Sequence, residues 1–162
     1  MRRALSILTI YLLVLSNARG IAATSGAHFF SVSDSIADNG VLVVSFDEGG
    51  LGKVTGQVTY TLNADVTANY ACINTGGNQP KASNKETVST PVTVTAEFTP
   101  AKNGRVIASI STSLLAPPAD FSCPGGQTLI LASVAYTSVV LTDTTNDLKV
   151  SITSISRTFL NL

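Results

Sequence analysis

Residues 54–72 alternate between apolar and polar side chains, and this pattern restricts the fold more than any other feature of the chain. The even positions are apolar apart from Gly56 and read Val54, Gly56, Val58, Tyr60, Leu62, Ala64, Val66, Ala68, Tyr70 and Cys72. The odd positions between them are polar apart from Ala71. Successive side chains of a β-strand point to opposite faces, so a period of two predicts a strand with one buried and one solvated face.

The length of this segment conflicts with the size of the chain. A straight strand over 54–72 would extend about 60 Å. A globular domain of about 140 residues has a radius of gyration of only about 14 Å. We therefore expect the segment to bend or split, and we place the break at residues 63–65.

The same alternation predicts further strands, at residues 29–36, 41–46, 91–98, 106–114, 129–141 and 148–159. Asn-Gly pairs at Asn39-Gly40 and Asn103-Gly104 predict tight hairpins with type I′ turns, because both residue types tolerate positive φ. Residues 129–141 are apolar on both faces, which indicates a central strand. The alternation slips at Ser154, where we expect a bulge.

Seven or eight strands separated by regular turns, with no convincing helical period, predict an all-β fold. We expect an antiparallel β-sandwich, Ig-like in shape, with a small barrel as the alternative. We assign residues 1–22 to a secretory signal peptide and residues 23–162 to a single sandwich domain.

The first 22 residues have the basic start, apolar stretch and small-residue end of a signal peptide. Cleavage after Gly20, Ala23 or Ala27 is the alternative to cleavage after Ala22. The apolar stretch is shorter than the roughly 20 residues that cross a bilayer, and no later stretch approaches that length. We therefore expect a secreted, extracellular protein that does not insert into membranes.

The mature chain is mildly acidic. It retains seven basic and ten acidic residues, a net charge of −3, because three arginines lie within residues 1–22. No cluster of Lys and Arg is present in the sequence, and such clusters are what phosphate backbones bind. Nucleic acid is therefore not an expected partner.

The chain has two cysteines, Cys72 and Cys123. In an exported protein the expected outcome is one disulfide. Strand directions place the connection after Cys72 and the loop around Cys123 at the same end of the sandwich, so a bridge is geometrically reasonable. Two cysteines and the distant His28 supply too few ligands for a zinc site, and we predict no metal and no cofactor.

A polar connection follows Cys72 and runs over residues 73–87. A disulfide at its base would hold it against the loop at 115–127. We predict that this connection is a binding loop, and its most accessible polar side chains are Asn74, Asn78, Gln79, Lys81 and Lys85.

Enzymatic chemistry is not expected. The single histidine, His28, lies near the mature N-terminus, and neither a G-x-S-x-G elbow nor a phosphate-binding glycine loop is present. A hydrolase with a carboxylate pair remains as an alternative, without spacing that favours one pair. Asp143 with Asp147, and Asp47 with Glu48, are formal calcium candidates, but Asp is also an ordinary turn residue.

Tyr70-Ala71-Cys72 resembles the Tyr-x-Cys pattern of immunoglobulin domains. In those domains the pattern surrounds the second cysteine and a tryptophan packs on the bridge, whereas here it surrounds the first and the chain has no tryptophan. We therefore interpret Tyr70 as an inward-facing tyrosine beside a disulfide.

Four short motifs, YACIN, NKETV, FSCPGGQ and TDTTN, occur in this order. Together they resemble a group of small secreted fungal and bacterial proteins with two cysteines, over residues 28–146. The resemblance implies secretion, one disulfide and a β-rich fold, and it supplies no functional residue.

These observations predict a secreted, non-enzymatic binding protein, and an effector that acts on a host or cell-surface macromolecule is one form that such a protein takes. The alternative is a carbohydrate- or wall-binding module. Sugar sites usually use exposed aromatic rings, and the tyrosines at 60 and 70 are expected to point inward, which counts against it. The expected partner is thus an extracellular protein or glycan.

Overall fold

The computed structural model describes residues 26–52, 56–74, 76 and 84–161. The described chain forms eight β-strands: β1 (His28–Ile36), β2 (Leu42–Gly49), β3 (Val58–Asn74), β4 (Lys85–Phe98), β5 (Val106–Ser111), β6 (Gln127–Asp143), β7 (Leu148–Ile152) and β8 (Ile155–Thr158). Within those described ranges, no helix has the length and apolar character needed to traverse a bilayer. The segment assigned to the signal peptide, 1–22, lies outside the described residues.

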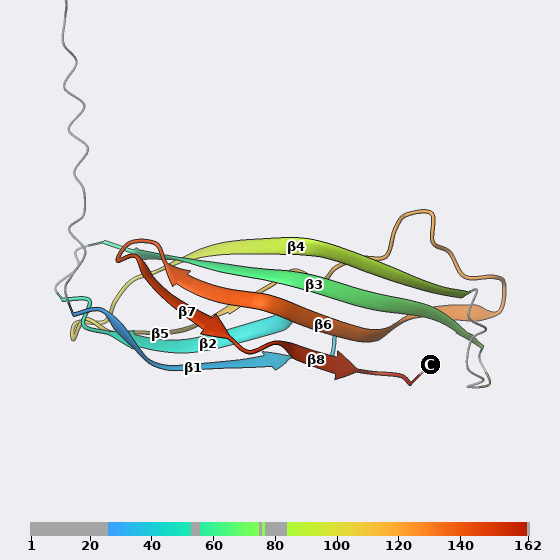
Figure 1. Ribbon diagram of the computed structural model, residues 1–162, viewed down its shortest axis with the longest axis horizontal. Helices are drawn as coiled ribbons and strands as arrows, with labels where there is room; N and C mark the ends of the chain where they lie inside the picture. Colours follow the sequence, from blue (N-terminus) through green and yellow to red (C-terminus); the bar gives the residue numbers. More distant parts are fainter. Residues whose placement is uncertain (1–25, 53–55, 75, 77–83, 162) are drawn as a thin grey trace, which may run out of the picture.

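The strands form two antiparallel sheets that pack face to face (Figure 1). One sheet has three strands in the order β1-β2-β5. The other has the order β4-β3-β6, and the far side of β6 pairs with β7 and then with β8. The predicted all-β sandwich is confirmed, with eight strands. The two sheets are separate, so the barrel alternative is wrong.

β3 has the alternating burial that its sequence predicts. Its even positions from Val58 to Cys72 are all 5% exposed or less and form the centre of the core. β3 does not split at residues 63–65, because it pairs with β4 without interruption from Val58 to Ala71, but its register against β6 shifts between Asn63 and Asp65. The strand fits because the sandwich is elongated along its strands (Figure 1).

Two different parts of the chain cover the inner face of β3. The three-stranded sheet covers one half, where Phe46 packs against Tyr60 with ring centroids 4.6 Å apart. The loop between β5 and β6 covers the other half, where the Tyr70 hydroxyl donates to the Leu115 carbonyl and Leu115 and Phe121 pack on the core. A strand of this length thus keeps a buried face without a second sheet of equal length.

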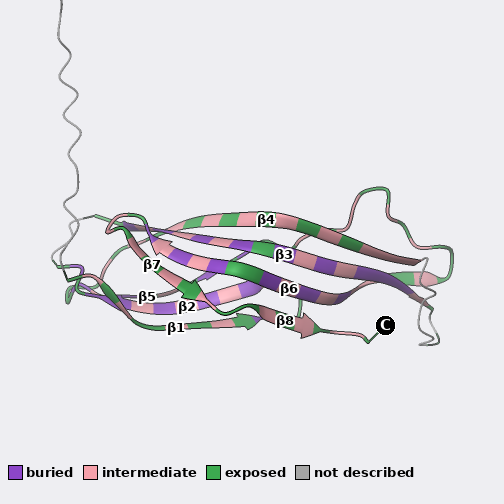
Figure 2. Ribbon diagram, viewed as in Figure 1, coloured by how far each residue is buried: buried purple, intermediate pink, exposed green. Residues whose placement is uncertain are grey.

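β6 changes the phase of its buried side chains halfway along. Before Thr137 the even positions face the core, and after Ser138 the odd positions do, starting with Val139 (Figure 2). Ser138 has φ of 52° and lies in a register shift against β3. The central position of β6 is confirmed, but its apolar run reflects this phase change rather than burial on both faces.

The break between β7 and β8 lies beside the same irregularity. β7 pairs with β6 from Val139 onward, and β8 pairs with β6 up to Tyr136. The predicted slip at Ser154 is therefore confirmed in position, as an interruption between two strands rather than a bulge within one.

Replacing Ser138 by glycine is expected to raise the free energy of unfolding by about 1 kcal/mol, because a non-glycine residue at positive φ is strained. Ser138→Val is expected to lower it by at least the same amount, since a β-branched side chain tolerates this conformation poorly. Urea unfolding of both variants measures the difference. A stabilised valine variant would contradict the assignment.

The two Asn-Gly turns differ from the prediction. Gly40 and Gly104 have positive φ, but Asn39 and Asn103 do not, so neither turn is type I′. At both sites the glycine amide bonds the carbonyl three residues earlier, as in a type I turn followed by a left-handed glycine. The first turn joins the β1-β2 hairpin. The second joins β4 to β5, which lie in different sheets, so the hairpin predicted there is wrong.

A buried polar network joins the two sheets. The Tyr136 hydroxyl on β6 donates to the Gly40 carbonyl at 2.8 Å and lies 3.2 Å from Thr112 Oγ1. Thr112 Oγ1 in turn accepts from the Leu42 amide at 3.1 Å. These hydrogen bonds connect the β1-β2 turn to the large sheet. They also give each of these buried polar groups a partner.

Candidate functional site

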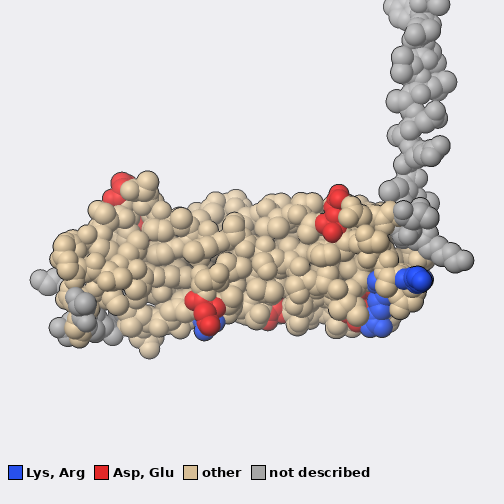
Figure 3. All heavy atoms as spheres, turned by 180° about the vertical axis from the view of Figure 1, so that it is seen from behind, with Lys and Arg blue, Asp and Glu red and all other residues tan. Residues whose placement is uncertain are grey.

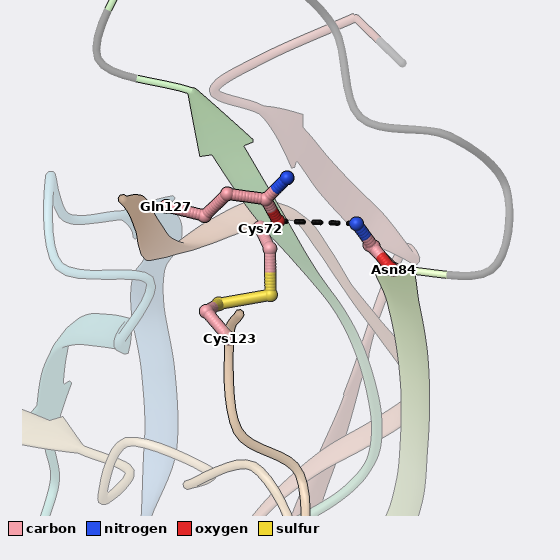
Figure 4. Close-up of a disulfide and its surroundings, with 4 residues drawn as sticks. All are labelled: Cys72, Asn84, Cys123 and Gln127. Carbon is pink, nitrogen blue, oxygen red and sulfur yellow. Dashed lines mark hydrogen bonds between the residues drawn. A yellow bond between two sulfur atoms is a disulfide. The ribbon is translucent and has the colours of Figure 1, made fainter. Parts of the chain in front are cut away.

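The disulfide joins Cys72, near the end of β3, to Cys123, in the loop before β6, and confirms the predicted bridge. The S–S distance is 2.03 Å and the Cα atoms are 5.5 Å apart. Beside it, Asn84 Nδ2 donates to Gln127 Oε1 at 3.1 Å (Figure 4). This end of the sandwich, which we call the disulfide end, therefore holds the starts of β4 and β6 and the end of β3 together.

Two of the five residues of the predicted binding loop lie at the disulfide end. Asn74 is the last residue of β3 and is exposed, and Lys85 is the first residue of β4 and is half-buried. Asn78, Gln79 and Lys81 lie outside the described residues. The prediction that these side chains bind a partner stays a prediction.

A row of four polar side chains crosses the outer face of the large sheet at the disulfide end. The strand register places Thr87 of β4, Asn69 of β3, Ser133 of β6 and Thr158 of β8 side by side. They form the floor of a hollow of about 240 Å³, whose walls include Lys85, Glu86, Leu160 and Asn161. We call this site the polar hollow.

The floor of the polar hollow is held by directional hydrogen bonds. Thr87 Oγ1 donates to Asn69 Oδ1 at 2.6 Å, and Asn69 Nδ2 donates to Ser133 Oγ at 2.9 Å. The amide of Asn69 is thus held at its oxygen and at its nitrogen. Its orientation determines that the Thr87 hydroxyl donates to it and that the Ser133 hydroxyl accepts from it.

The row was not identified from the sequence. The outward position of Asn69 follows from the alternation, but its neighbours belong to strands 18, 64 and 89 residues away in the chain, as the register places them. The polar, strand-forming residues Thr87, Ser133 and Thr158 are common on any wet sheet face. Only the strand order distinguishes them from other polar side chains.

A pair of buried carboxyl groups lies in the core, at the end away from the disulfide. Glu48 and Asp143 are fully buried, as is Tyr60 beside them in the register. Within the described part of the chain, neither Glu48 oxygen nor the Tyr60 hydroxyl has a hydrogen-bond partner. The pKa of Glu48 is raised to about 7, mainly by burial and additionally by the neighbouring Asp143 charge, while the nearby Tyr60 hydroxyl acts in the opposite direction.

The buried carboxyl pair is not accessible from solvent. Glu48 and Asp143 are each 0% exposed, so a substrate does not reach them in this conformation. Burial also raises the pKa of Tyr60, so its phenol stays protonated. A carboxylate pair of the hydrolase type therefore does not form at this place.

Two of the acidic residues considered for calcium have partners within the chain. Asp143 Oδ1 accepts from the Thr145 and Asn146 amides and caps the β6-β7 turn. Asp47 pairs with Arg105, which lowers the pKa of that carboxyl mainly through the hydrogen bond. In the ranges that the structure describes, no group of three or more potential metal ligands occurs.

Among the described large apolar side chains, the two most exposed lie on the outer face of the three-stranded sheet. Phe30 is 58% exposed and Ile107 is 74% exposed. The Arg105 guanidinium lies 5.0 Å from the centre of the Phe30 ring and pairs with Asp47. Charged residues are otherwise few and scattered on the face seen in Figure 3. The charge on this patch is already neutralised within the molecule.

Comparison of the chain with protein-family models, with curated proteins and with solved structures found no match.

Proposed function

We propose that this chain is a secreted, non-enzymatic binding protein that engages a host or cell-surface macromolecule through the polar hollow. The observation that carries the proposal is the row of hydroxyl and amide groups across four strands, which forms a floor with a fixed hydrogen-bond pattern. A binding site on strands holds its groups more precisely than one on a loop.

Two further features support the proposal. The disulfide is typical of proteins that fold in an oxidising compartment, in agreement with the signal peptide expected at residues 1–22. Lys85 belongs both to the predicted binding loop and to the wall of the hollow. Lys85 therefore connects the proposed site with the described end of that loop.

Replacing Lys85 by alanine is expected to weaken partner binding about tenfold, because a hydrogen bond from a charged donor contributes about 1.5–3 kcal/mol. Lys149→Ala is the matched control, since Lys149 is exposed on β7 of the same sheet and does not line the hollow. The mature protein is used to purify partners from extracellular fluid. Binding of each purified partner to the variants is then measured by biolayer interferometry.

Recovery of no partner under any condition would count against a binding function. Equal binding by the Lys85 and Lys149 variants would move the contact surface away from the disulfide end. Both variants should unfold at the temperature of the natural chain, because neither side chain belongs to the core.

A further inference from the structure

We propose that the polar hollow binds a neutral glycan chain, with one sugar ring seated on the row of Thr87, Asn69, Ser133 and Thr158. This inference rests on the proposed binding function and assigns a ligand class to the same site.

The two hydroxyls that are bonded to Asn69 offer a ligand different groups. Thr87 Oγ1 gives its single hydrogen to Asn69, so its lone pairs remain available to a ligand. Ser133 Oγ accepts from Asn69, so its own hydrogen remains available. A sugar hydroxyl both donates and accepts and so meets either group, whereas a carboxylate or phosphate only accepts and an ammonium only donates.

The charges around the hollow do not add to this selection. Lys85 and Glu86 are the charged residues among the described ones that line it. Glu86 pairs with the inward-facing Tyr70 and also lines a separate hollow with Asp120, so its side chain belongs to the opposite face of β4. The Lys85 ammonium donates to a sugar hydroxyl as readily as to an anion, so the choice of a neutral ligand depends on the groups of the floor.

The size of the hollow fits one ring of a longer chain. Its volume of about 240 Å³ is below the range of about 300–1,000 Å³ that encloses drug-sized ligands. The next row of the same face continues the polar surface, and there Thr67 Oγ1 lies 2.8 Å from Ser89 Oγ. Two residues along a strand separate the rows by about 6.7 Å, so adjoining rings meet further hydroxyls.

Aromatic stacking does not contribute at this site. Tyr60, Tyr70 and Tyr136 are 5% exposed or less and point into the core. Leu160 is the apolar wall of the hollow. Recognition therefore depends on the hydroxyl and amide groups of the floor, and removal of the central amide should have a large effect.

The test uses the mature protein in co-sedimentation with insoluble cellulose, chitin, β-1,3-glucan and mannan. The natural chain is expected to sediment with at least one polymer, and Asn69→Ala is expected to bind that polymer about tenfold more weakly, since it loses the hydrogen bonds that orient the floor. Asn63→Ala is the matched control. Asn63 lies on the same face of β3 and accepts from Thr93 Oγ1 at 2.7 Å, but it is outside the hollow.

Binding to none of the four polymers, or equal binding by the two asparagine variants, would overturn the glycan assignment. A protein partner whose binding depends on Lys85 would then leave the proposed binding function standing and identify its partner as protein. If the protein binds none of the four polymers and no protein partner either, the proposed binding function itself is refuted. A thermal melt of both variants excludes an effect through unfolding.

Discussion

Replacing Glu48 by glutamine is expected to raise the free energy of unfolding by about 3 kcal/mol above pH 7, while leaving it nearly unchanged below pH 4.5. The carboxyl group is fully buried without a hydrogen-bond partner among the described residues, and its pKa is raised from 4.5 to about 7. Glutamine has nearly the same shape and does not ionise. The variant therefore avoids the cost of a buried negative charge.

The direction of this effect follows from proton binding. Between pH 4.5 and 7 the unfolded chain loses the Glu48 proton, whereas the folded chain keeps it. The folded state thus binds more protons, and its stability falls as pH rises through this window. Below pH 4.5 both states are protonated and the contribution of Glu48 is fully present. Above pH 7 both are ionised and the loss is complete.

Urea unfolding of the natural chain and of Glu48→Gln, in steps from pH 4 to pH 8.5, measures the effect. The difference between the two curves cancels the titration of all other groups, including Asp47, whose lowered pKa adds stability that is lost on acidification. Glu97→Gln is the control, because Glu97 is exposed on β4. Parallel curves for the natural chain and Glu48→Gln would show that Glu48 keeps an ordinary pKa.

Removing the disulfide by the double change Cys72→Ser and Cys123→Ser is expected to cost about 4 kcal/mol of unfolding free energy. The bridge closes a loop of 51 residues, and the loop-entropy relation gives about this value. The disulfide and the hydrogen bond from Tyr70 to the Leu115 carbonyl both hold the loop that covers the far half of β3, and the variant loses the first of them. A fall of this size approaches the whole stability of a small domain, about 5–15 kcal/mol.

The variant Tyr70→Phe tests the second interaction that holds this loop. It removes the hydroxyl that donates to the Leu115 carbonyl and is expected to cost about 1 kcal/mol, the net value of one hydrogen bond. Urea unfolding of the natural chain with and without reductant gives an independent measure of the bridge. A double-serine variant that unfolds at the same urea concentration as the natural chain would mean that Tyr70 and the apolar contacts alone hold the loop.

Local alternation predicted the buried face of β3 correctly, because the period of a strand is independent of its partners. The length of β3 was misjudged, since a radius of gyration assumes a compact sphere and the sandwich is elongated. The phase change in β6 could not be read locally either. It depends on Ser138 adopting positive φ opposite Ala64, which is a property of the paired sheet.

Turn chemistry was predicted less well than strand identity. Gly40 and Gly104 adopt the expected positive φ, but the sequence does not indicate that the strands on the two sides of Gly104, β4 and β5, lie in different sheets. The buried position of Glu48 was also not apparent, although it continues the inward series of Leu42, Val44 and Phe46 on β2. The alternation along β2, which continues from apolar residues to this carboxylate, is the signal in the sequence that indicates the burial of Glu48.

The polar hollow and the loop between β5 and β6, which carries Cys123, lie on opposite faces of the same short length of β3. Asn69 faces the hollow, while Tyr70 and Cys72 face the loop that covers the core. The floor of the hollow is therefore a single β-sheet. The disulfide, which a reductant can break, lies on the other face of that sheet. Ligand affinity at this site is expected to respond to the redox state of the surroundings, although no cysteine lines the hollow.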